Sequence, residues 1–166
     1  MNKESVRVID NCLDVPIFKK IKSILTSSNI PWYWSEVVSG HDLNFDSIDN
    51  VMFGHGFFID YKASQTLPLL EPIFDILRPK SLVRVKANLY INTSKIIKHG
   101  FHVDTPFDCS AAILYINTND GYTYFEDRSM IESVENRLVI FSSSLKHGGT
   151  TTTNQQRRIL ININYF

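Results

Sequence analysis

The chain has 166 residues, of which 43% are hydrophobic and 20% are charged, and its formal net charge is zero. This composition is typical of a globular protein with a real hydrophobic core, so we expect one domain over residues 1–166. The balanced charge gives no global indication of nucleic acid or of an acidic membrane as a partner.

The cysteines and the N-terminal residues indicate the compartment. Cys12 and Cys109 are too few for a disulfide framework and are not spaced as a metal-binding pair, so we expect reduced thiols. The first residues, MNKESVRVID, contain no apolar signal core. No apolar run approaches the ~20 residues that a membrane helix needs. We therefore expect a cytoplasmic protein with no membrane partner.

The first half of the chain predicts two helices among short extended segments. Residues 5–10 predict a strand, and residues 15–28 carry apolar side chains at helical spacing, with Asp14 as a candidate N-cap and Pro16 in the first turn. Residues 30–38 look extended, and residues 56–62 return as a strand. A second helix is predicted over residues 66–79, ending near Pro79.

Two segments of this half are candidates for substrate contact. The polar residues 39–56 predict a long loop, which is either a lid with glycine hinges or a solvated connection. The aromatic run Trp32, Tyr33 and Trp34 is favoured as packing, with a substrate groove as the alternative.

The second half is rich in predicted strands. In residues 82–91, polar and apolar side chains alternate, so we expect Val85 and Ala87 under the helices, and Asn88 and Tyr90 inside a barrel. Further strand candidates follow at regular spacing, at residues 110–117, 122–127, 129–134, 136–143 and 157–166. Many short strands after N-terminal helices predict a mainly β fold, an antiparallel sandwich or barrel with the helices packed on one sheet.

A metal site is indicated by "HVD" at residues 102–104 and by the later "SLKHGG". His102 and Asp104 are two positions apart, so on an extended chain both side chains project to the same face. His147 supplies a third ligand after a strongly apolar strand. Two histidines and one carboxylate on one face of an octahedron leave three positions open, which suits non-haem Fe(II).

The other three histidines are weaker candidates. His99 lies three positions before His102 and so points to the opposite face, which favours a role behind the ligands or at the surface. His41 and His55 lie in the predicted loop, where surface or lid histidines are expected and a substrate contact is the alternative.

An arginine of the last strand is a candidate anion-binding residue. Arg157 shares strand parity with Ile159, Ile161 and Ile163, a face that we expect to be interior. A buried guanidinium needs an anion and can grip a carboxylate with two hydrogen bonds. The alternatives are a structural ion pair, or an inward Arg158 in place of Arg157.

Together, "HVD", "SLKHGG" and Arg157, with "GYTYFED" and "NRLVIF" between them, resemble the Fe(II)/2-oxoglutarate-dependent oxygenases. The likeness covers about residues 82–166 and is greatest to the prolyl-hydroxylase-like branch and to small members encoded by tailed phages. It implies a double-stranded β-helix, a cupin-like jelly roll, as the catalytic core at residues 82–166. Residues 1–81 would then be a support and lid region, and a phage-encoded protein would act in the host cytoplasm.

The resemblance also implies roles for individual residues. His102, Asp104 and His147 would bind the iron, and Arg157 would hold the distal carboxylate of 2-oxoglutarate. The further co-substrate contacts that it implies are Tyr115, Tyr90 and Asn88. For Tyr115, the alternative is a core aromatic on a strand.

The implied activity is that of a dioxygenase that hydroxylates a substrate while 2-oxoglutarate and O₂ are converted to succinate and CO₂, with ascorbate in a supporting role. Related halogenases lack the carboxylate ligand, so Asp104 favours hydroxylation. A peptidyl proline is the first substrate candidate, a small molecule follows closely, and nucleic acid is the least favoured because no basic-aromatic stripe stands out. The rival interpretations are a cupin-like domain that binds a metal or small ligand without turnover, and a structural jelly roll.

Overall fold

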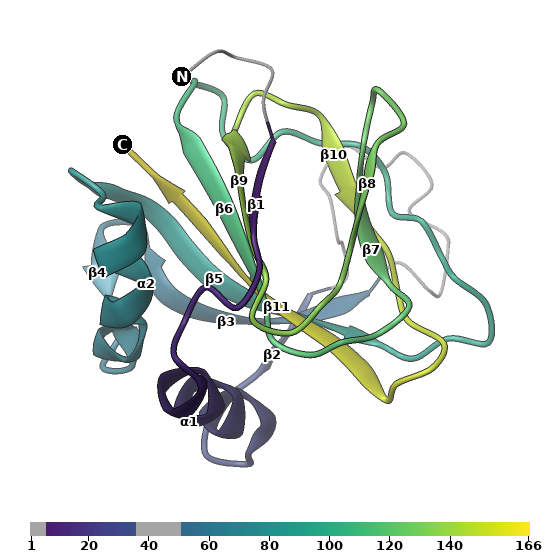
Figure 1. Cartoon of the computed structure of the whole chain (residues 1–166), viewed down its shortest axis with the longest axis horizontal. Coiled ribbons are helices and arrows are strands. Elements are labelled where there is room, and N and C mark those ends of the chain that lie inside the picture. The colour runs from purple at the N-terminus through teal and green to yellow at the C-terminus, as the bar shows by residue number, and fades with distance from the viewer. Residues whose placement is uncertain (1–5, 36–50) are drawn as a thin grey trace.

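The computed structural model describes residues 6–35 and 51–166. Its first half contains two α-helices, one 3₁₀ helix and four strands among the described residues (Figure 1). These elements are β1 (Arg7–Ile9), α1 (Val15–Thr26), β2 (Tyr33–Ser35), β3 (Met52–Ile59), β4 (Lys62–Ala63), the 3₁₀ helix η1 (Leu67–Leu70) and α2 (Glu71–Leu77).

The second half contains only strands among the described elements, as the alternating pattern predicts. They are β5 (Leu82–Ile91), β6 (Ser110–Tyr115), β7 (Tyr122–Phe125), β8 (Met130–Glu132), β9 (Leu138–Ser142), β10 (His147–Gly149) and β11 (Arg157–Tyr165). The predicted class, mainly β with N-terminal helices, is confirmed.

Local sequence sets the ends of both helices. Asp14 occupies the N-cap position of α1 and a proline lies in the first turn, although the Asp14 side chain makes no capping hydrogen bond. The α1 helix stops at Thr26, two residues before the predicted end. In α2, Arg78 adopts a left-handed backbone conformation (φ 49°) just before Pro79, which ends the helix.

The strands form two antiparallel sheets that face each other. The large sheet has eight strands, in the order β1-β9-β6-β11-β5-β3-β2, with β4 paired to β3, and the small sheet has the order β10-β7-β8. In Figure 1 the small sheet lies on one side of the large sheet, and both helices lie on the other. The long strands β5 and β11 pair along nearly their full length in the middle of the large sheet.

A separate hydrophobic core packs on each face of the large sheet. Beneath the helices, Phe18, Ile21 and Leu25 of α1 join one core with Val85 and Ala87. The same core contains Ile159, Ile161 and Ile163 of β11. Between the two sheets lies the second core, which contains Tyr90, Ile113, Tyr115, Phe125, Phe141 and Leu160. The expected direction of the two faces of residues 82–91 is therefore confirmed.

The structure corrects the prediction of a loop over residues 39–56. Residues 52–56 belong to β3, and His55 is buried there. Its two ring nitrogens lie 2.9 Å from the Pro31 carbonyl oxygen and 3.0 Å from the Thr66 hydroxyl, so His55 holds β3 in place and is neither a surface nor a lid residue. His41 lies outside the described residues, as does most of the predicted loop.

The three aromatic residues at positions 32–34 differ in their exposure to solvent. Trp32 packs against the core beneath the helices, while Tyr33 and Trp34 are more than half exposed on β2. Among the helices of the described residues, none is both long and apolar enough to cross a membrane.

Candidate active site

The structure brings His102, Asp104 and His147 together between the two sheets. His102 and Asp104 lie in the segment that follows β5, and His147 begins β10. The backbones of the two histidines pair as an isolated antiparallel bridge, in which each amide nitrogen donates to the other carbonyl oxygen, at 2.9 and 3.0 Å. This pairing fixes the spacing of the two imidazole rings.

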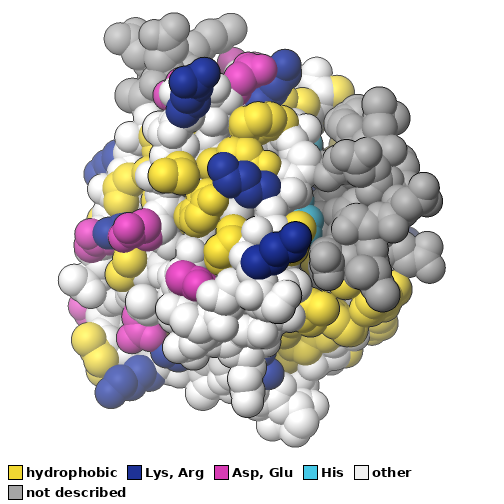
Figure 2. All heavy atoms as spheres, turned by 90° about the vertical axis from the view of Figure 1, so that its right-hand side faces the viewer, with side chains coloured by type: hydrophobic (Ala, Val, Ile, Leu, Met, Phe, Trp, Pro, Cys, Tyr) yellow, Lys and Arg dark blue, Asp and Glu magenta, His cyan; other side chains and the backbone are white. Residues whose placement is uncertain are grey.

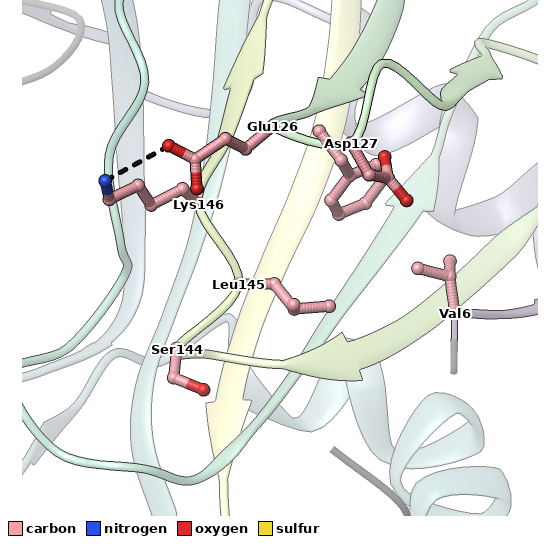
Figure 3. A pocket seen from close by; sticks show the side chains of 7 residues that line it. Val6, Glu126, Asp127, Ser144, Leu145 and Lys146 are labelled. Carbon is pink, nitrogen blue, oxygen red and sulfur yellow. Dashed lines mark hydrogen bonds and ion pairs between the residues drawn. The ribbon is translucent and has the colours of Figure 1, made fainter. Parts of the chain in front are cut away.

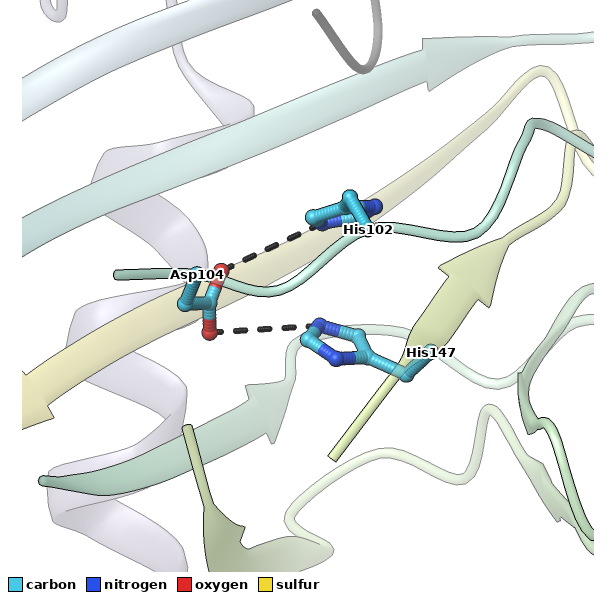
Figure 4. A group of neighbouring side chains, drawn as sticks. All are labelled: His102, Asp104 and His147. Atoms are coloured by element: carbon cyan, nitrogen blue, oxygen red, sulfur yellow. Dashed lines mark ion pairs between the residues drawn. The ribbon is translucent and has the colours of Figure 1, made fainter. Parts of the chain in front are cut away.

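The three side chains offer ligand atoms to one point (Figure 4). The Nε2 atoms of His102 and His147 each lie 3.9 Å from a carboxylate oxygen of Asp104, and the three candidate ligand atoms all lie within 4.8 Å of one another. Bonds of about 2.0–2.2 Å at right angles to a common ion place ligand atoms about 3 Å apart, so the three side chains reach one ion once each moves by less than about 1 Å. The spacing is thus that of a site for a divalent cation.

The protonation of the histidines suits metal binding. The Nδ1 atom of His147 lies 2.9 Å from the Leu145 carbonyl oxygen, which assigns the proton to Nδ1 and leaves the Nε2 lone pair directed at the site. Burial, and to a lesser extent the neighbouring His147, lower the pKa of His102 to about 4. His102 is therefore neutral near pH 7, as a metal ligand must be.

Asp104 is held by three donors that the sequence analysis did not single out. Its Oδ1 accepts a hydrogen bond from Arg84 Nη2 at 3.1 Å, and its Oδ2 accepts from the amides of Asn162 and Asn164 at 3.1 and 3.0 Å. Burial opposes ionisation of Asp104, but His147, Asn164, Arg84 and Asn162 together hold its pKa below the usual range. The carboxylate is therefore ionised and oriented.

The interior arginine is Arg158, and the prediction of an inward Arg157 is wrong. Arg157 is only partly buried, and its Nη2 donates to the Thr26 carbonyl oxygen at the end of α1. Arg158 is fully buried between the two sheets. The isoleucines that share parity with Arg157 are indeed interior, but they face the core beneath the helices, whereas the site lies on the other face.

Arg158 is held rigidly, with neutral groups as its partners. Its Nε donates to Ser133 Oγ at 2.7 Å, Nη1 to the Thr150 carbonyl oxygen at 3.3 Å, and Nη2 to Thr123 Oγ1 at 3.2 Å. Among the described residues, no carboxylate forms an ion pair with it. A fully buried guanidinium without an anion is costly, so its surroundings favour an anionic ligand.

Aromatic rings and glycines shape the space around Arg158. Its guanidinium carbon lies 5.2 Å from the centroid of the Tyr90 ring and 5.6 Å from that of Tyr115. At Gly121, a Cβ atom would lie 2.6 Å from the Arg158 Cδ atom, so a larger residue there would displace the arginine.

The other residues that the resemblance implies as co-substrate contacts fall into two groups by their position relative to the site. Asn88 and Tyr90 line a small cavity of about 30 Å³ beside His102 and His147, together with Ile113, Thr123, Gly149, Leu160 and Asn162. Buried Asn88 Oδ1 has no hydrogen-bond partner. Tyr115 does not line this cavity. Its hydroxyl donates to Thr123 Oγ1 at 2.8 Å, so it acts behind Thr123.

His99 is buried and stacks on Tyr90, with 5.4 Å between the ring centroids. It is therefore not at the surface and not among the three converging residues. It lies behind the cavity wall, in agreement with the expectation of a role behind the ligands.

Figure 2 shows one face of the molecule, on which a histidine side chain reaches the surface beside hydrophobic and basic side chains. The His102 side chain is 24% exposed. A larger cavity of about 710 Å³ lies near Phe125 and Leu145, with the Lys146–Glu126 ion pair (3.2 Å) at its rim (Figure 3). None of the predicted site residues lines it, so we assign the chemistry to the smaller cavity, which is lined by His102 and His147.

This arrangement of sheets, with three convergent ligands between them, defines a class of fold. Comparison with solved structures shows that it is the fold of the 2-oxoglutarate- and Fe(II)-dependent oxygenases. The predicted jelly-roll core is thereby confirmed, and the resemblance seen in the sequence holds at the level of the fold. The sequence itself matches no family model and no curated protein.

Three structures illustrate the likeness. A 2OG-Fe(II) oxygenase family oxidoreductase from Burkholderia pseudomallei has a TM-score of 0.68 at 11% identity, over 96% of this chain and 84% of that one. A prolyl hydroxylase from Trichoplax adhaerens, in complex with a hypoxia-inducible-factor peptide fragment, has a TM-score of 0.65 at 14% identity, over 99% and 84%. The viral collagen prolyl hydroxylase of Paramecium Bursaria Chlorella virus-1, in a 2OG complex, has a TM-score of 0.61 at 11% identity, over 97% and 94%.

Proposed function

We propose that the protein is an Fe(II)/2-oxoglutarate-dependent dioxygenase that hydroxylates an organic substrate. The observation that carries this proposal is the convergence of His102, Asp104 and His147 in a fold shared with that family. The proposal treats residues 1–166 as one oxygenase domain, because β1, β2 and β3 of the first half extend the sheet that carries the site.

The ligand set fits Fe(II). Two imidazoles and one ionised carboxylate on a single face leave the opposite face of an octahedron open for a co-substrate and O₂. Iron(II), when bound, would supply the oxidative chemistry in which 2-oxoglutarate and O₂ yield succinate, CO₂ and one oxygen atom for the substrate. The protein's own part is to orient Asp104 through Arg84, Asn162 and Asn164, and to keep His102 neutral.

Arg158 fits the distal carboxylate of 2-oxoglutarate. Its guanidinium is buried without an anionic partner among the described residues, and it lies against Tyr90, which lines the cavity beside His102 and His147. A rigid guanidinium is suited to a planar carboxylate. 2-Oxoglutarate is larger than the cavity, so binding requires wall side chains such as Tyr90 or Leu160 to move.

For the primary substrate we propose two candidate classes and not a single compound. A peptidyl proline is the first candidate, supported by the likeness to a prolyl hydroxylase that binds a peptide, and a small molecule is the second. The ionised carboxylate of Asp104 occupies the position that halogenases leave for chloride, which supports hydroxylation. The cytoplasmic location stays a prediction.

The test is turnover of 2-oxoglutarate without added primary substrate. Purified protein is incubated with Fe(II), ascorbate and labelled 2-oxoglutarate, and release of labelled CO₂ and formation of succinate are measured. We expect slow uncoupled turnover that is lost in His102→Ala and Asp104→Ala. A protein that binds metal and 2-oxoglutarate but forms no succinate would be a non-catalytic cupin-like domain. A folded, metal-loaded protein that does not bind 2-oxoglutarate would refute the proposal.

A further inference from the structure

The strand β5 carries two basic residues, Arg84 and Lys86, whose positive charges the proposed iron and 2-oxoglutarate sites do not fully explain. Arg84 and Lys86 share the strand parity of Asn88 and Tyr90, the side that faces the site, while Val85 and Ala87 pack beneath the helices. Neither Arg84 nor Lys86 was singled out from the sequence, because charged residues on a strand usually face solvent.

The register of β5 and β11 shows where these residues lie relative to the co-substrate end. Tyr90 pairs with Arg158, whereas Lys86 pairs with Asn162 and Arg84 pairs with Asn164. From Tyr90 to Lys86 the strand advances about 13 Å. Since Asn162 and Asn164 both hold Asp104, the two basic residues lie beside Asp104, at the end of the site that is remote from Arg158.

The contacts of Arg84 and Lys86 leave positive charge uncompensated. Arg84 Nη2 is paired with Asp104, but the buried Nε of Arg84 has no hydrogen-bond partner. Within the described part of the chain, the Lys86 ammonium makes no ion pair or hydrogen bond. Burial and, to a lesser extent, Arg84 lower the pKa of Lys86 to about 8 against the opposing effect of Asp104, so the ammonium is largely desolvated near the carboxylate.

The charges around the site therefore do not balance once 2-oxoglutarate has engaged Arg158. Asp104 is the one ionised carboxylate among the described residues at the site, and it already serves Arg84 and the metal position. A second anion beside Lys86 would offset part of this positive charge. Because the Arg158 end belongs to the co-substrate, this anion must arrive with the primary substrate.

We propose that Lys86, supported by Arg84, selects a primary substrate that carries a carboxylate close to the carbon that is oxidised. This inference rests on the proposed function and specifies its substrate class. The carboxylate has two sources with the same chemistry, the α-carboxylate of a free amino acid or an acidic side chain next to the modified residue of a peptide. Lys86 acts as a specificity-determining residue that attracts one substrate charge type and disfavours neutral analogues.

The test measures binding and not turnover. Protein loaded with Mn(II) and saturating 2-oxoglutarate under nitrogen is exposed to matched libraries, and retained compounds are quantified by mass spectrometry. One pair of libraries consists of free amino acids and the corresponding primary amides. The other consists of capped tripeptides with a randomised central residue followed by Glu or by Gln. We expect retention of carboxylate members to exceed that of neutral members by about tenfold in at least one pair, and the pair that responds identifies the source.

Three variants separate charge recognition from a structural effect. Lys86→Met should abolish the preference for the carboxylate members, while Lys86→Arg should retain most of it. Lys62→Met, a matched loss of charge at an exposed position of β4, should leave the preference intact. Equal retention of charged and neutral members in the native protein, including retention of neither, would overturn the inference, as would an unchanged preference in Lys86→Met.

The failure of this inference is distinguishable from the failure of the proposed function. Binding of 2-oxoglutarate to the Mn(II)-loaded protein is measured separately by calorimetry. Loss of that binding speaks against the oxygenase, whereas its presence without selection for carboxylates speaks only against the role of Lys86.

Discussion

Replacement of Arg158 tests the proposed grip on the co-substrate. Arg158→Gln removes the buried positive charge but keeps a side chain that can donate to Ser133 or Thr123, the neutral partners of the arginine. The variant is compared with Arg157→Gln, the neighbouring arginine, whose guanidinium contacts the Thr26 carbonyl oxygen instead. The two variants differ by one position and make the same chemical change.

The magnitude follows from burial and contact. Arg158 is 0% exposed, so a carboxylate that binds it is not screened by water, and loss of one partner of such a pair costs about 3 kcal/mol. In binding terms this is roughly a hundredfold increase in the Kd for 2-oxoglutarate. For Arg157→Gln we expect a change of less than about threefold, because its contact is on the far side of the sheet.

The assay is calorimetric titration of Mn(II)-loaded protein with 2-oxoglutarate under nitrogen. Thermal unfolding of each variant is measured alongside, since loss of a buried arginine also affects stability. A folded Arg158→Gln variant that binds 2-oxoglutarate as tightly as the native protein would refute the reasoning. A larger loss in Arg157→Gln would refute it as well, and would restore the assignment made from strand parity.

Three further predictions concern the groups around the site. Asn164→Ala removes one of the three donors to Asp104, and we expect Mn(II) affinity, measured by competition with a chelator, to fall about tenfold; unchanged affinity would show that the clamp is dispensable. Since the folded-state pKa of His102 is depressed to about 4 from 6.5, the unfolded chain binds more protons between these values. The free energy of unfolding of the metal-free protein, measured by urea denaturation, should therefore rise by up to about 3 kcal/mol from pH 4 to 6.5. In His102→Gln this rise should be smaller. An equal rise with pH in both proteins would contradict the lowered pKa of His102. Tyr115→Phe should weaken 2-oxoglutarate binding only about fivefold in the calorimetric titration, because the hydroxyl acts through Thr123; a loss as large as that of Arg158→Gln would indicate direct contact.

Sequence patterns were sufficient to select three residues that the structure brings together as candidate metal ligands, and to orient one long strand. The i, i+2 spacing of His102 and Asp104 places both on one side of an extended segment, and alternation in residues 82–91 correctly separates Tyr90 from Ala87. These are local properties of an extended chain, so they need no knowledge of the tertiary structure. His147 could be chosen only because its residue type completes the set.

The inward arginine was missed because strand parity gives two faces but does not say which face meets the site. In β11 both faces are buried, one by the helices and one by the small sheet, so the apolar parity of Ile159 and Ile161 pointed to the wrong interior. The signal that could have corrected this is the polar alternation of "ININ", since Asn162 and Asn164 share parity with Arg158. A run of buried amides beside an arginine is typical of a polar site and not of a core.

The contacts of Arg84, Lys86 and His55 depend on strand pairing across long sequence separations. The register of β5 with β11 brings Arg84 beside Asn164, and the pairing of β3 with β5 buries His55. No local pattern specifies these registers, because many pairings satisfy the same alternation. The positive charge beside Asp104 could therefore be located only from the three-dimensional structure.

The central claim is that His102, Asp104 and His147 hold an iron to which 2-oxoglutarate chelates. Its most direct test is the visible absorption spectrum of the Fe(II)-loaded protein under nitrogen, before and after addition of 2-oxoglutarate. A keto acid that chelates Fe(II) through its carboxylate and keto oxygen gives a charge-transfer band, whereas glutarate, which lacks the keto group, does not. The account predicts that the band appears with 2-oxoglutarate in the native protein and is absent in His147→Ala. A band that persists in His147→Ala, or native protein that binds both Fe(II) and 2-oxoglutarate without producing the band, would contradict it.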